Sequence, residues 1–388
     1  MMTFEELYKT LVLRSAQHSA EPLPPCDPRQ LDCLLHPQSY APVIQTEVCA
    51  GGDCQNACQK SCIFDAIVRR EDGTLSIDAT RCAGCGACIS ACESGKLSAS
   101  RDILPAMEAV RKPGALSYAL IAPAFLGQFS EQVTPGKLRS AFKALGFSGM
   151  VEVALFADIL TLKEALEFDL NIRSDGDYQL TSCCCPMWIA MIRKIYHELM
   201  PHVPGSVSPM VACGRVIKRL HPEAVTVFVG PCVAKKSEAR EPDLQGAVDY
   251  VLTFQEVQDI LEAAQIDPAA LAESDKDHSS RAGRIYAHTG GVSEAVRSTV
   301  EHLSPNRPIA VRTMQADGVP GCRAMIEALR SGKADANFFE GMGCVGGCVG
   351  GPKAILNRER GRELVERYGE AAVYRTPLEN PYVLELLH

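Results

Sequence analysis

The sequence lacks an excess of positive charge. Its 39 lysine and arginine residues stand against 47 aspartate and glutamate residues, which gives a formal net charge of −8 at pH 7. Proteins that bind nucleic acid or an anionic membrane surface usually present a basic field to those partners. The charge balance therefore removes nucleic acid and membrane lipid from the partners that we expect.

Long hydrophobic runs are also missing. No stretch approaches the roughly 20 apolar residues that a bilayer-spanning helix needs. The N-terminus, MMTFEELYKTLVLRSAQ, lacks the basic start, apolar run and small-residue cleavage site of a secretory signal. The nine histidines show neither the HxxxH nor the HExxH spacing of metal sites. We therefore expect a cytoplasmic protein whose histidines do not form a metal site.

Cysteine, by contrast, is abundant. The chain has 18 cysteines in 388 residues, which is too dilute for a small disulfide-stapled domain but high for an ordinary enzyme. In a reducing compartment, closely spaced cysteines are more often metal ligands or catalytic groups than disulfides. Eight of the 18 fall between Cys49 and Cys92. Four isolated cysteines are expected to be buried or incidental thiols: Cys26, Cys33, Cys213 and Cys322.

This clustering divides the chain into three parts. We expect a helical and proline-rich lead-in over residues 1–40, a small cysteine-rich domain over 41–105 and a large domain over 106–388. In the large domain strand-like runs alternate with helical patterns, which predicts an α/β fold with largely parallel sheets. One helix should begin with a capping box at Thr253 to Glu256. The expected strands cover residues 115–121, 150–155, 224–229, 249–252, 285–287 and 308–313.

The small domain carries two runs of cysteines with iron–sulfur spacing. The run Cys82-x2-Cys85-x2-Cys88-x3-Cys92 is typical of bacterial ferredoxins, in which three thiolates hold one [4Fe–4S] cubane and the fourth ligates the other. A run with wider spacing, Cys49-x4-Cys54-x3-Cys58-x3-Cys62, precedes it. Zinc is the alternative, but structural zinc sites use two pairs of ligands rather than three plus one. Crossed ligation would place one cluster on Cys49, Cys54, Cys58 and Cys92, and the other on Cys62, Cys82, Cys85 and Cys88. Such a domain transfers single electrons, so bond chemistry must lie in the large domain.

Three glycine- and proline-rich motifs of the large domain also contain cysteine. They are residues 181–188 (TSCCCPMW), 230–238 (GPCVAKKSE) and 340–352 (EGMGCVGGCVGGP). The first two follow strand-like runs, where open α/β sheets usually bind ligands. One thiolate of the first motif, together with Cys232, Cys344 and Cys348, gives four soft ligands, enough for a third cubane. Buried structural thiols would explain a single cysteine better than four.

The three motifs resemble those of [FeFe]-hydrogenases, and the TSCCCPMW form resembles the less-studied group B clade. The resemblance covers about residues 41–388. It implies a two-lobed catalytic domain preceded by a small α+β ferredoxin-like domain. It also implies an H-cluster, in which a [4Fe–4S] cubane shares one thiolate with a diiron subsite carrying CO, cyanide and azadithiolate. By motif position the cubane ligands would be Cys185, Cys232, Cys344 and Cys348, with Cys348 shared.

The resemblance also assigns roles around the H-cluster. Cys184 would relay protons, with Cys183 as the alternative because this motif has one extra cysteine. Lys235 would donate a hydrogen bond to a cyanide ligand. Three further residues would surround the diiron subsite: Ser182 and Pro231 in the shell of diatomic ligands and Met342 beside the iron pair.

Two acids three residues apart, Glu164 and Glu167, resemble the family's proton-conducting glutamate pair. An ordinary exposed helix face is the alternative. The serine that bridges the pair in well-studied members falls at Pro204, so Ser206, Ser208 or water would have to replace it.

The resemblance implies an enzyme that catalyses H2 ⇌ 2 H+ + 2 e−. Electrons would pass through the two small-domain clusters to ferredoxin or a similar carrier, and maturation proteins would supply the diiron site. A sensory hydrogenase homologue is one alternative, disfavoured because no signalling domain follows the third motif. An iron–sulfur assembly protein of the hydrogenase-like type is another, disfavoured by the Cys232-x2-Lys235 spacing and by Cys184. The run 290–292 (GGV) before a helix could aim N–H groups at anionic cluster ligands.

Overall fold

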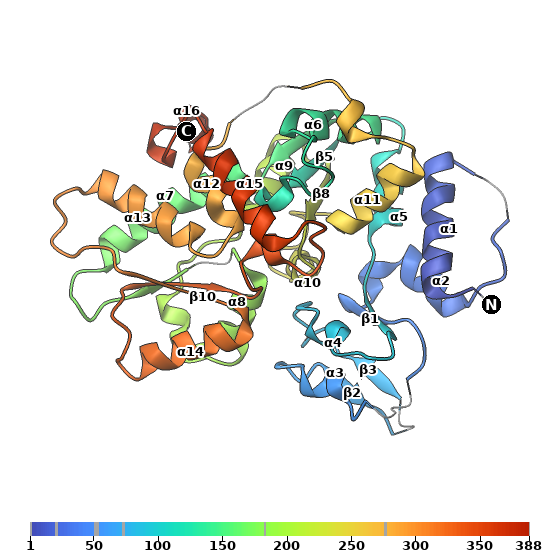
Figure 1. Ribbon diagram of the computed structural model, residues 1–388, viewed down its shortest axis with the longest axis horizontal. Helices are drawn as coiled ribbons and strands as arrows, with labels where there is room; N and C mark the ends of the chain where they lie inside the picture. Colours follow the sequence, from blue (N-terminus) through green and yellow to red (C-terminus); the bar gives the residue numbers. More distant parts are fainter. Residues whose placement is uncertain are drawn as a thin grey trace.

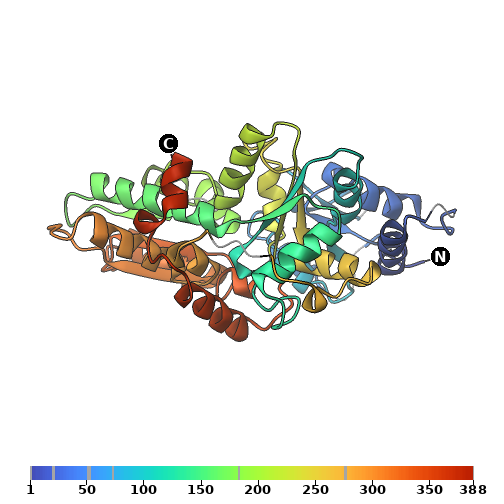
Figure 2. The ribbon, with the colours of Figure 1, turned by 90° about the horizontal axis from the view of Figure 1, so that it is seen from above.

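The molecule is elongated, with two sheet-containing lobes and a smaller N-terminal part (Figures 1 and 2). A computed structural model describes residues 2–19, 22–49, 54–71, 74–181, 184–274 and 278–387. The N-terminus lies at the end that carries the cysteine-rich segment, and the C-terminus lies over the opposite lobe (Figure 1).

The first lobe is built on a four-stranded parallel sheet with the order β6-β5-β8-β9. Its strands are Gly149–Glu152, Ser117–Ile121, Val225–Gly230 and Tyr250–Thr253 in that order. The two central strands are almost entirely buried, as is typical of parallel strands covered on both faces. The helices packed against the sheet are α5 (Ile103–Val110), α6 (Pro135–Ala144), α9 (Pro209–Leu220) and α11 (Phe254–Ala263). The capping box of Thr253 and Glu256 begins α11, as predicted.

The second lobe contains a three-stranded parallel sheet with the order β10-β11-β7. Its strands are Thr313–Asp317, Phe338–Met342 and Gln179–Leu180. The main helices around it are α7 (Ala154–Asn171), α8 (Pro186–Lys194), α13 (Gly291–Leu303) and α14 (Gly318–Arg330). The predicted α/β class with mostly parallel sheets is therefore confirmed.

Three of the expected strands differ from the structure. Residues 285–287 form the 3₁₀ turn η5 (Ile285–Ala287) directly after α12 (Arg281–Arg284), so that prediction was wrong. A three-residue apolar run cannot be told from a buried helical turn by periodicity. The strand expected at 308–313 begins only at Thr313, where pairing with Phe338 starts. The strand expected at 150–155 ends at Glu152, because α7 begins two residues later.

The N-terminal part combines two helices with two small antiparallel sheets. Helices α1 (Phe4–Gln17) and α2 (Pro28–Leu35) come first, and α1 packs on α11 and α5 of the first lobe. The sheets pair β1 (Val43–Gln45) with β4 (Leu97–Ala99) and β2 (Ile67–Arg69) with β3 (Leu75–Ile77). The short helices α3 (Ala57–Lys60) and α4 (Ala87–Ser90) each carry one cysteine of the two runs.

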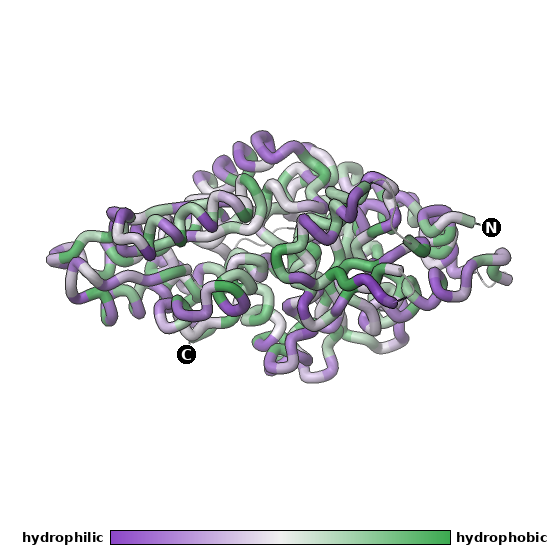
Figure 3. Tube along the Cα trace, turned by 90° about the horizontal axis from the view of Figure 1, so that it is seen from below, coloured by the Kyte–Doolittle hydropathy of each residue, from purple (hydrophilic) through white to green (hydrophobic). Residues whose placement is uncertain are grey.

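The remaining elements connect these layers. They are α10 (Ala234–Ala239), α15 (Arg358–Glu370), α16 (Pro381–Leu387), and the 3₁₀ turns η1 (Pro37–Ser39), η2 (Pro123–Phe125), η3 (His197–His202), η4 (Pro268–Ala270), η6 (Cys348–Gly350) and η7 (Pro377–Glu379). Hydrophilic and hydrophobic residues alternate along the outer helices (Figure 3). Within the described ranges, no helix combines the length and the hydrophobicity that crossing a bilayer requires.

Candidate functional site

Three cysteine-bearing loops begin where parallel strands of both sheets end. The first follows β7 of the second lobe, the second follows β8 of the first lobe, and the third follows β11 of the second lobe. The carboxyl ends of parallel strands are the usual ligand-binding edge of open α/β sheets. Two predicted residues of the first loop, Ser182 and Cys183, lie outside the described residues.

Four thiols lie within electrostatic reach of one another at this junction of the lobes. Burial raises the pKa of Cys344 well above its usual range, and Cys232, Cys185 and Cys348 raise it further. Burial also raises the pKa of Cys232 to about 11 and that of Cys348 to about 12, with Cys185 as the next contributor in both. Each thiol residue nevertheless keeps some accessible surface, so the protein leaves space beside the sulfurs. This arrangement fits a cubane bound by four thiolates.

Glycines of the third loop allow the loops to approach closely. A Cβ atom at Gly341 would lie 2.1 Å from Cε3 of Trp188, and one at Gly343 would lie 2.5 Å from Met187. The amide of Gly343 also donates to Sγ of Cys185 over 3.3 Å. The Gly-Met-Gly run of the third motif therefore fits against the start of α8, and the two motifs fix each other's position.

Two further predicted residues are placed beside the thiols. Met342 is buried and packs in the same apolar cluster as Cys184 and Cys185. Pro231 is buried in front of Cys232, and a Cβ atom at Gly351 would lie 2.8 Å from the Cβ of Pro231. Both side chains thus shape the wall of the thiol site.

Lys235 is a buried cation close to the thiols. Its Nζ donates to Oε2 of Glu238 over 2.6 Å. Burial lowers its pKa, but the Glu238 carboxylate and then Cys232 and Cys348 raise it, and the net direction is upward. Lys235 is therefore charged at neutral pH and can donate a hydrogen bond to an anionic ligand beside the thiols.

The adjacent Lys236 has a structural role. It is fully buried, and its Nζ contacts Oδ1 of Asp102 at 3.3 Å and Oε2 of Glu256 at 3.2 Å. It also donates to the carbonyl of Val251 over 2.6 Å. These contacts fasten α10 to the start of α11 and to the segment that leads out of the cysteine-rich part. The two lysines of the motif thus face different surroundings, which the sequence did not reveal.

Cys184 and Glu164 lie within electrostatic reach of each other. Burial raises the pKa of Cys184 well above its usual range, and the charge of Glu164 is the next contributor. Glu164 is fully buried on α7. The hydroxyl of Tyr286, which Glu164 also influences, lies 2.8 Å from Oγ1 of Thr161 one turn earlier on α7. The structure therefore brings two of the four predicted catalytic residues together in a buried polar region.

Glu167 differs from Glu164 in its surroundings. Its side chain is 26% exposed, and its carboxylate lies 3.8 Å from Nζ of Lys163. Lys163 in turn donates to the carbonyl of Gly205 over 2.7 Å, which brings the loop containing Ser206 to this part of α7. The inner acid thus lies in the core, and the outer acid lies at the surface.

Sequence reasoning missed the role of Glu340, the first residue of the third motif. Glu340 is fully buried, and its carboxylate accepts hydrogen bonds from the amides of Gly290 and Ser293 and from the Ser293 hydroxyl, at 2.7 to 2.8 Å. Of the three N–H groups that we expected to face cluster ligands, that of Gly290 therefore binds this side chain, and that of Gly291 donates to the carbonyl of His288 over 3.0 Å. For these two groups the expectation was wrong. The signal was present as a glutamate in an otherwise apolar and glycine-rich motif.

The eight cysteines of the small segment fall into two groups. One small cavity is lined by all four of Cys49, Cys54, Cys58 and Cys92. Burial raises the pKa of Cys88 to about 12, followed by the charges of Cys82, Cys85 and Cys62. Within the described ranges, no three histidine, cysteine, aspartate or glutamate side chains lie close enough to hold a single metal ion. A four-iron cluster is larger than one ion and separates its thiolates more widely. The two groups are the ones that crossed ligation requires.

The second group of small-segment thiols lies directly against the second motif. A Cβ atom at Gly84 would lie 2.9 Å from Cα of Ala234. The hydroxyl of Ser237 donates to the carbonyl of Cys82 over 3.1 Å. Because Ala234 follows Cys232 by two residues, the backbone brings these two groups of thiols side by side.

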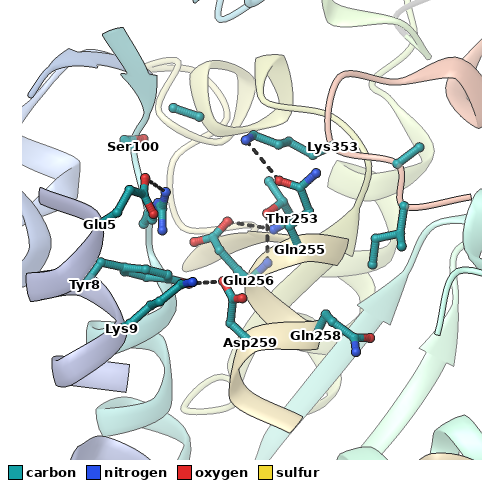
Figure 4. A pocket seen from close by; sticks show the side chains of 14 residues that line it. Glu5, Tyr8, Lys9, Ser100, Thr253, Gln255, Glu256, Gln258, Asp259 and Lys353 are labelled. Atoms are coloured by element: carbon teal, nitrogen blue, oxygen red, sulfur yellow. Dashed lines mark hydrogen bonds and ion pairs between the residues drawn. The ribbon is translucent and has the colours of Figure 1, made fainter. Parts of the chain in front are cut away.

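Two pockets lie near these elements. One of about 320 Å³ lies between α8, the loop at 203–208 and α10, and Ser206, Ser208 and Glu238 are among its lining residues. The other, of about 400 Å³, is shown in Figure 4. Its charged groups largely satisfy one another, because Glu5 contacts Arg101 and Tyr8 donates to Asp259 over 2.8 Å.

Comparison with known proteins shows where this arrangement recurs. The family model described as "Iron only hydrogenase large subunit, C-terminal domain" matches residues 116–352, which is more than half of the chain. The chain belongs to this family. The match contains all three cysteine-bearing loops of the hydrogenase-family domain.

Individual relatives are distant. The chain is 26% identical over 371 residues to the NADP-reducing hydrogenase subunit HndD of Solidesulfovibrio fructosivorans, covering 80% of this chain and 63% of that protein. It is 28% identical over 273 residues to iron hydrogenase 1 of Clostridium pasteurianum, covering 60% of this chain and 47% of that protein. The chain therefore spans between about half and just under two thirds of these relatives. It is also 22% identical over 353 residues to Protein NAR1 of Arabidopsis thaliana, covering 71% of this chain and 73% of that protein.

Solved structures agree on the fold. A single-residue variant of the apo [FeFe]-hydrogenase HydA1 from Chlamydomonas reinhardtii matches with a TM-score of 0.61 and 21% sequence identity over 74% of this chain and 93% of that chain. The catalytic lobes therefore have the [FeFe]-hydrogenase fold.

Proposed function

We propose that this protein is a hydrogenase that catalyses H2 ⇌ 2 H+ + 2 e− at an H-cluster. The supporting observation is the meeting of Cys185, Cys232, Cys344 and Cys348 beside a buried lysine and beside Cys184 and the buried Glu164. Splitting H2 into a hydride and a proton requires a Lewis acid and a nearby base. When bound, the H-cluster supplies both, through its iron and the amine of its azadithiolate.

The chain's own residues hold the cluster, orient its ligands and deliver protons to it. The four thiolates would hold the cubane, and Cys348 would be the thiolate shared with the diiron subsite that carries CO and cyanide. Lys235, fixed by Glu238, donates a hydrogen bond to a cyanide ligand. Pro231 and Met342 exclude water from the same wall. We also propose that Ser182 lies beside the CO and cyanide ligands.

Proton delivery uses the buried pair. Cys184 receives the proton at Sγ, and the Glu164 carboxylate passes it outward along α7. Glu167 is the outer acid. Pro204 cannot relay a proton. The hydroxyl of Ser206, the hydroxyl of Ser208 or water therefore completes the link between Glu164 and Glu167. Cys183 is the alternative relay within the first motif.

Electron delivery uses the two small-segment groups of thiols. We propose one [4Fe–4S] cluster on Cys49, Cys54, Cys58 and Cys92 and a second on Cys62, Cys82, Cys85 and Cys88. The close approach of Gly84 to Ala234 supports a position of the second cluster beside the active site. The first would then exchange electrons with ferredoxin or a similar carrier in the cytoplasm.

An iron–sulfur assembly role is the second candidate. It is favoured by the similarity to Protein NAR1, of which 73% is covered, against 63% of HndD and 47% of iron hydrogenase 1. Other matched relatives named NAR1 are cytosolic Fe-S cluster assembly factors. The buried Lys235 and the pair of Cys184 and Glu164 argue against it, because assembly without H2 chemistry needs neither a cyanide partner nor a proton relay.

Infrared spectroscopy separates the two candidates. The protein should be matured with the proteins that assemble the diiron site and then examined for CO and cyanide stretching bands. We expect both sets of bands, together with H2 uptake or production. Their absence from protein with a full complement of [4Fe–4S] clusters would reject the hydrogenase and favour the assembly role.

A further inference from the structure

The single tryptophan of the chain has a buried hydrogen-bond donor without an acceptor. Trp188 is the only tryptophan in the sequence. Its side chain has no accessible surface, and its Nε1 has no hydrogen-bond partner within the described part of the chain. A buried tryptophan normally pairs its N–H, and leaving a buried donor unpaired costs about 1–3 kcal/mol. Such a group calls for an explanation, and a bound inorganic group is one.

The indole belongs to an apolar cluster that thiols of both groups contact. Trp188 belongs to an apolar cluster that includes Phe64 and Ala83 of the small segment, and against which Cys62, Cys85 and Cys185 pack. Cys85 and Cys62 belong to the second small-segment group, and Cys185 belongs to the active-site group. The tryptophan therefore occupies the region where the two proposed clusters come close.

The backbone indicates which group the N–H faces. Trp188 is the third residue of α8, and Cys185 is the extended residue that caps the start of this helix. A side chain at the third helical position lies next to the cap residue. Long helical side chains lean toward the preceding turn, here the turn that carries Cys185. A Cβ atom at Gly341 would lie 2.1 Å from Cε3, 2.3 Å from Cδ2 and 2.5 Å from Cζ3 of the ring, so a face of the indole, and not the edge that carries Nε1, packs on this glycine of β11.

We propose that the indole N–H of Trp188 donates a hydrogen bond to a sulfur of an iron–sulfur cluster, with the cubane at Cys185 as the favoured acceptor. This inference rests on the proposed function only in requiring a [4Fe–4S] cluster there. Hydrogen bonds to cluster sulfurs stabilise the more negative, reduced state and so raise the reduction potential. Trp188 would thus be a positioning and tuning residue of the electron path.

The matched variants are Trp188→Phe and Met191→Leu. Phenylalanine keeps a flat ring against Gly341 but has no N–H. Met191 is also fully buried in the same cluster on the same helix, so its substitution controls for changed packing. Redox titration followed by EPR should show one cluster signal shifted to more negative potential in Trp188→Phe, and no shift in Met191→Leu.

The acceptor is identified by which signal moves. A shifted potential of the active-site cubane supports the favoured acceptor. A shifted potential of the cluster at Cys62, Cys82, Cys85 and Cys88 supports a hydrogen bond from the same N–H to that cluster instead. Equal potentials in wild type and Trp188→Phe would overturn the proposal. A shift of equal size in both variants would also overturn it, because packing would then explain the effect.

A second measurement covers the case in which Trp188→Phe fails to fold or to bind iron. Wild-type protein labelled with ¹⁵N only at the indole nitrogen of tryptophan carries the label at one atom of the chain. Pulsed EPR of the reduced clusters should detect a ¹⁵N coupling, and its absence would overturn the proposal. The measurement needs no diiron subsite, so a protein without CO and cyanide bands, which would reject the hydrogenase, still answers this question.

Discussion

At the scale of single residues, burial separates groups that look alike in the sequence. Lys235 and Lys236 are neighbours, yet one pairs with Glu238 beside the thiols and the other joins an ionic network that fastens α10. Glu164 and Glu167 are three residues apart, yet only Glu164 is fully buried. The chemistry of each side chain follows from its surroundings because a buried charge interacts strongly with the few groups that face it.

The first prediction concerns Glu164. The substitution Glu164→Gln should lower H2 turnover by roughly two orders of magnitude, the usual contribution of a positioned proton-transfer group. The CO and cyanide bands should persist, since Glu164 holds no metal. Glu167→Gln should lower turnover less, because water can replace a partly exposed acid.

The control for these variants is Glu301→Gln, which removes a carboxylate that is 60% exposed on α13. It should behave as wild type in the same hydrogen-evolution assay. Near-normal turnover of Glu164→Gln would contradict the proposed proton route.

The second prediction concerns Asp158, which is fully buried on α7. Burial raises its pKa from 3.8 to about 6, against the hydrogen bonds that it accepts from Ser280, Gly283 and Asn380. Because the folded state binds this proton more tightly than the unfolded state, the resulting stability is fully present below about pH 4 and is lost as the pH rises through about 6. The difference amounts to about 3 kcal/mol.

Urea denaturation at a series of pH values measures this effect. Asp158→Asn has no such proton to bind, so its free energy of unfolding should fall less than that of wild type between about pH 4 and pH 7. Identical slopes for the two proteins would show that burial does not shift this group.

At the scale of elements, the active-site loops are positioned by close contacts between motifs. The third motif can lie against α8 only because Gly341 and Gly343 have no side chains. Glu340 then fastens the start of α13 to β11 through three hydrogen bonds. The glycines of the motif are therefore required for packing of neighbouring elements and not only for turn geometry.

The third prediction follows from this packing. Gly341→Ala places a Cβ atom 2.1 Å from the Trp188 ring, and the overpacking should reduce the free energy of unfolding by about 1–3 kcal/mol. Gly205→Ala is the matched control, since a Cβ atom there meets nothing within 4 Å. Thermal unfolding of both variants checks the prediction, and equal stability of the two would contradict it.

At the scale of the whole molecule, the small cysteine-rich segment and the catalytic lobes form one continuous electron path in the proposal. Figure 1 shows the segment with α3 and α4 beneath the first lobe. Gly84 and Ser237 make the contact between them. The spacing of the clusters therefore depends on packing across this junction.

The fourth prediction tests the junction. Gly84→Ala combines a left-handed φ of +68° with a Cβ atom 2.9 Å from Ala234, whereas Gly95→Ala has a φ of +67° and no neighbour within 4 Å. Both variants carry about 1–2 kcal/mol of backbone strain, but only the first pushes the segment away. Reduction of ferredoxin by H2 should slow severalfold in Gly84→Ala, with its CO and cyanide bands unchanged. Equal rates in the two variants would place the electron path elsewhere.

The sequence alone determined the α/β class, the four strands of the first-lobe sheet, the capping box of α11 and the family, because these depend on local periodicity and on residue types at fixed spacing. It did not determine the strands near residues 285 and 308, where short apolar runs fit several local structures. Only the tertiary structure decided that Glu340 binds the start of α13, that Lys236 is structural and that Trp188 is buried in a cluster that thiols of both groups contact. Each of these depends on contacts between residues far apart in the chain, and burial, which sets their chemistry, is a property of the assembled fold.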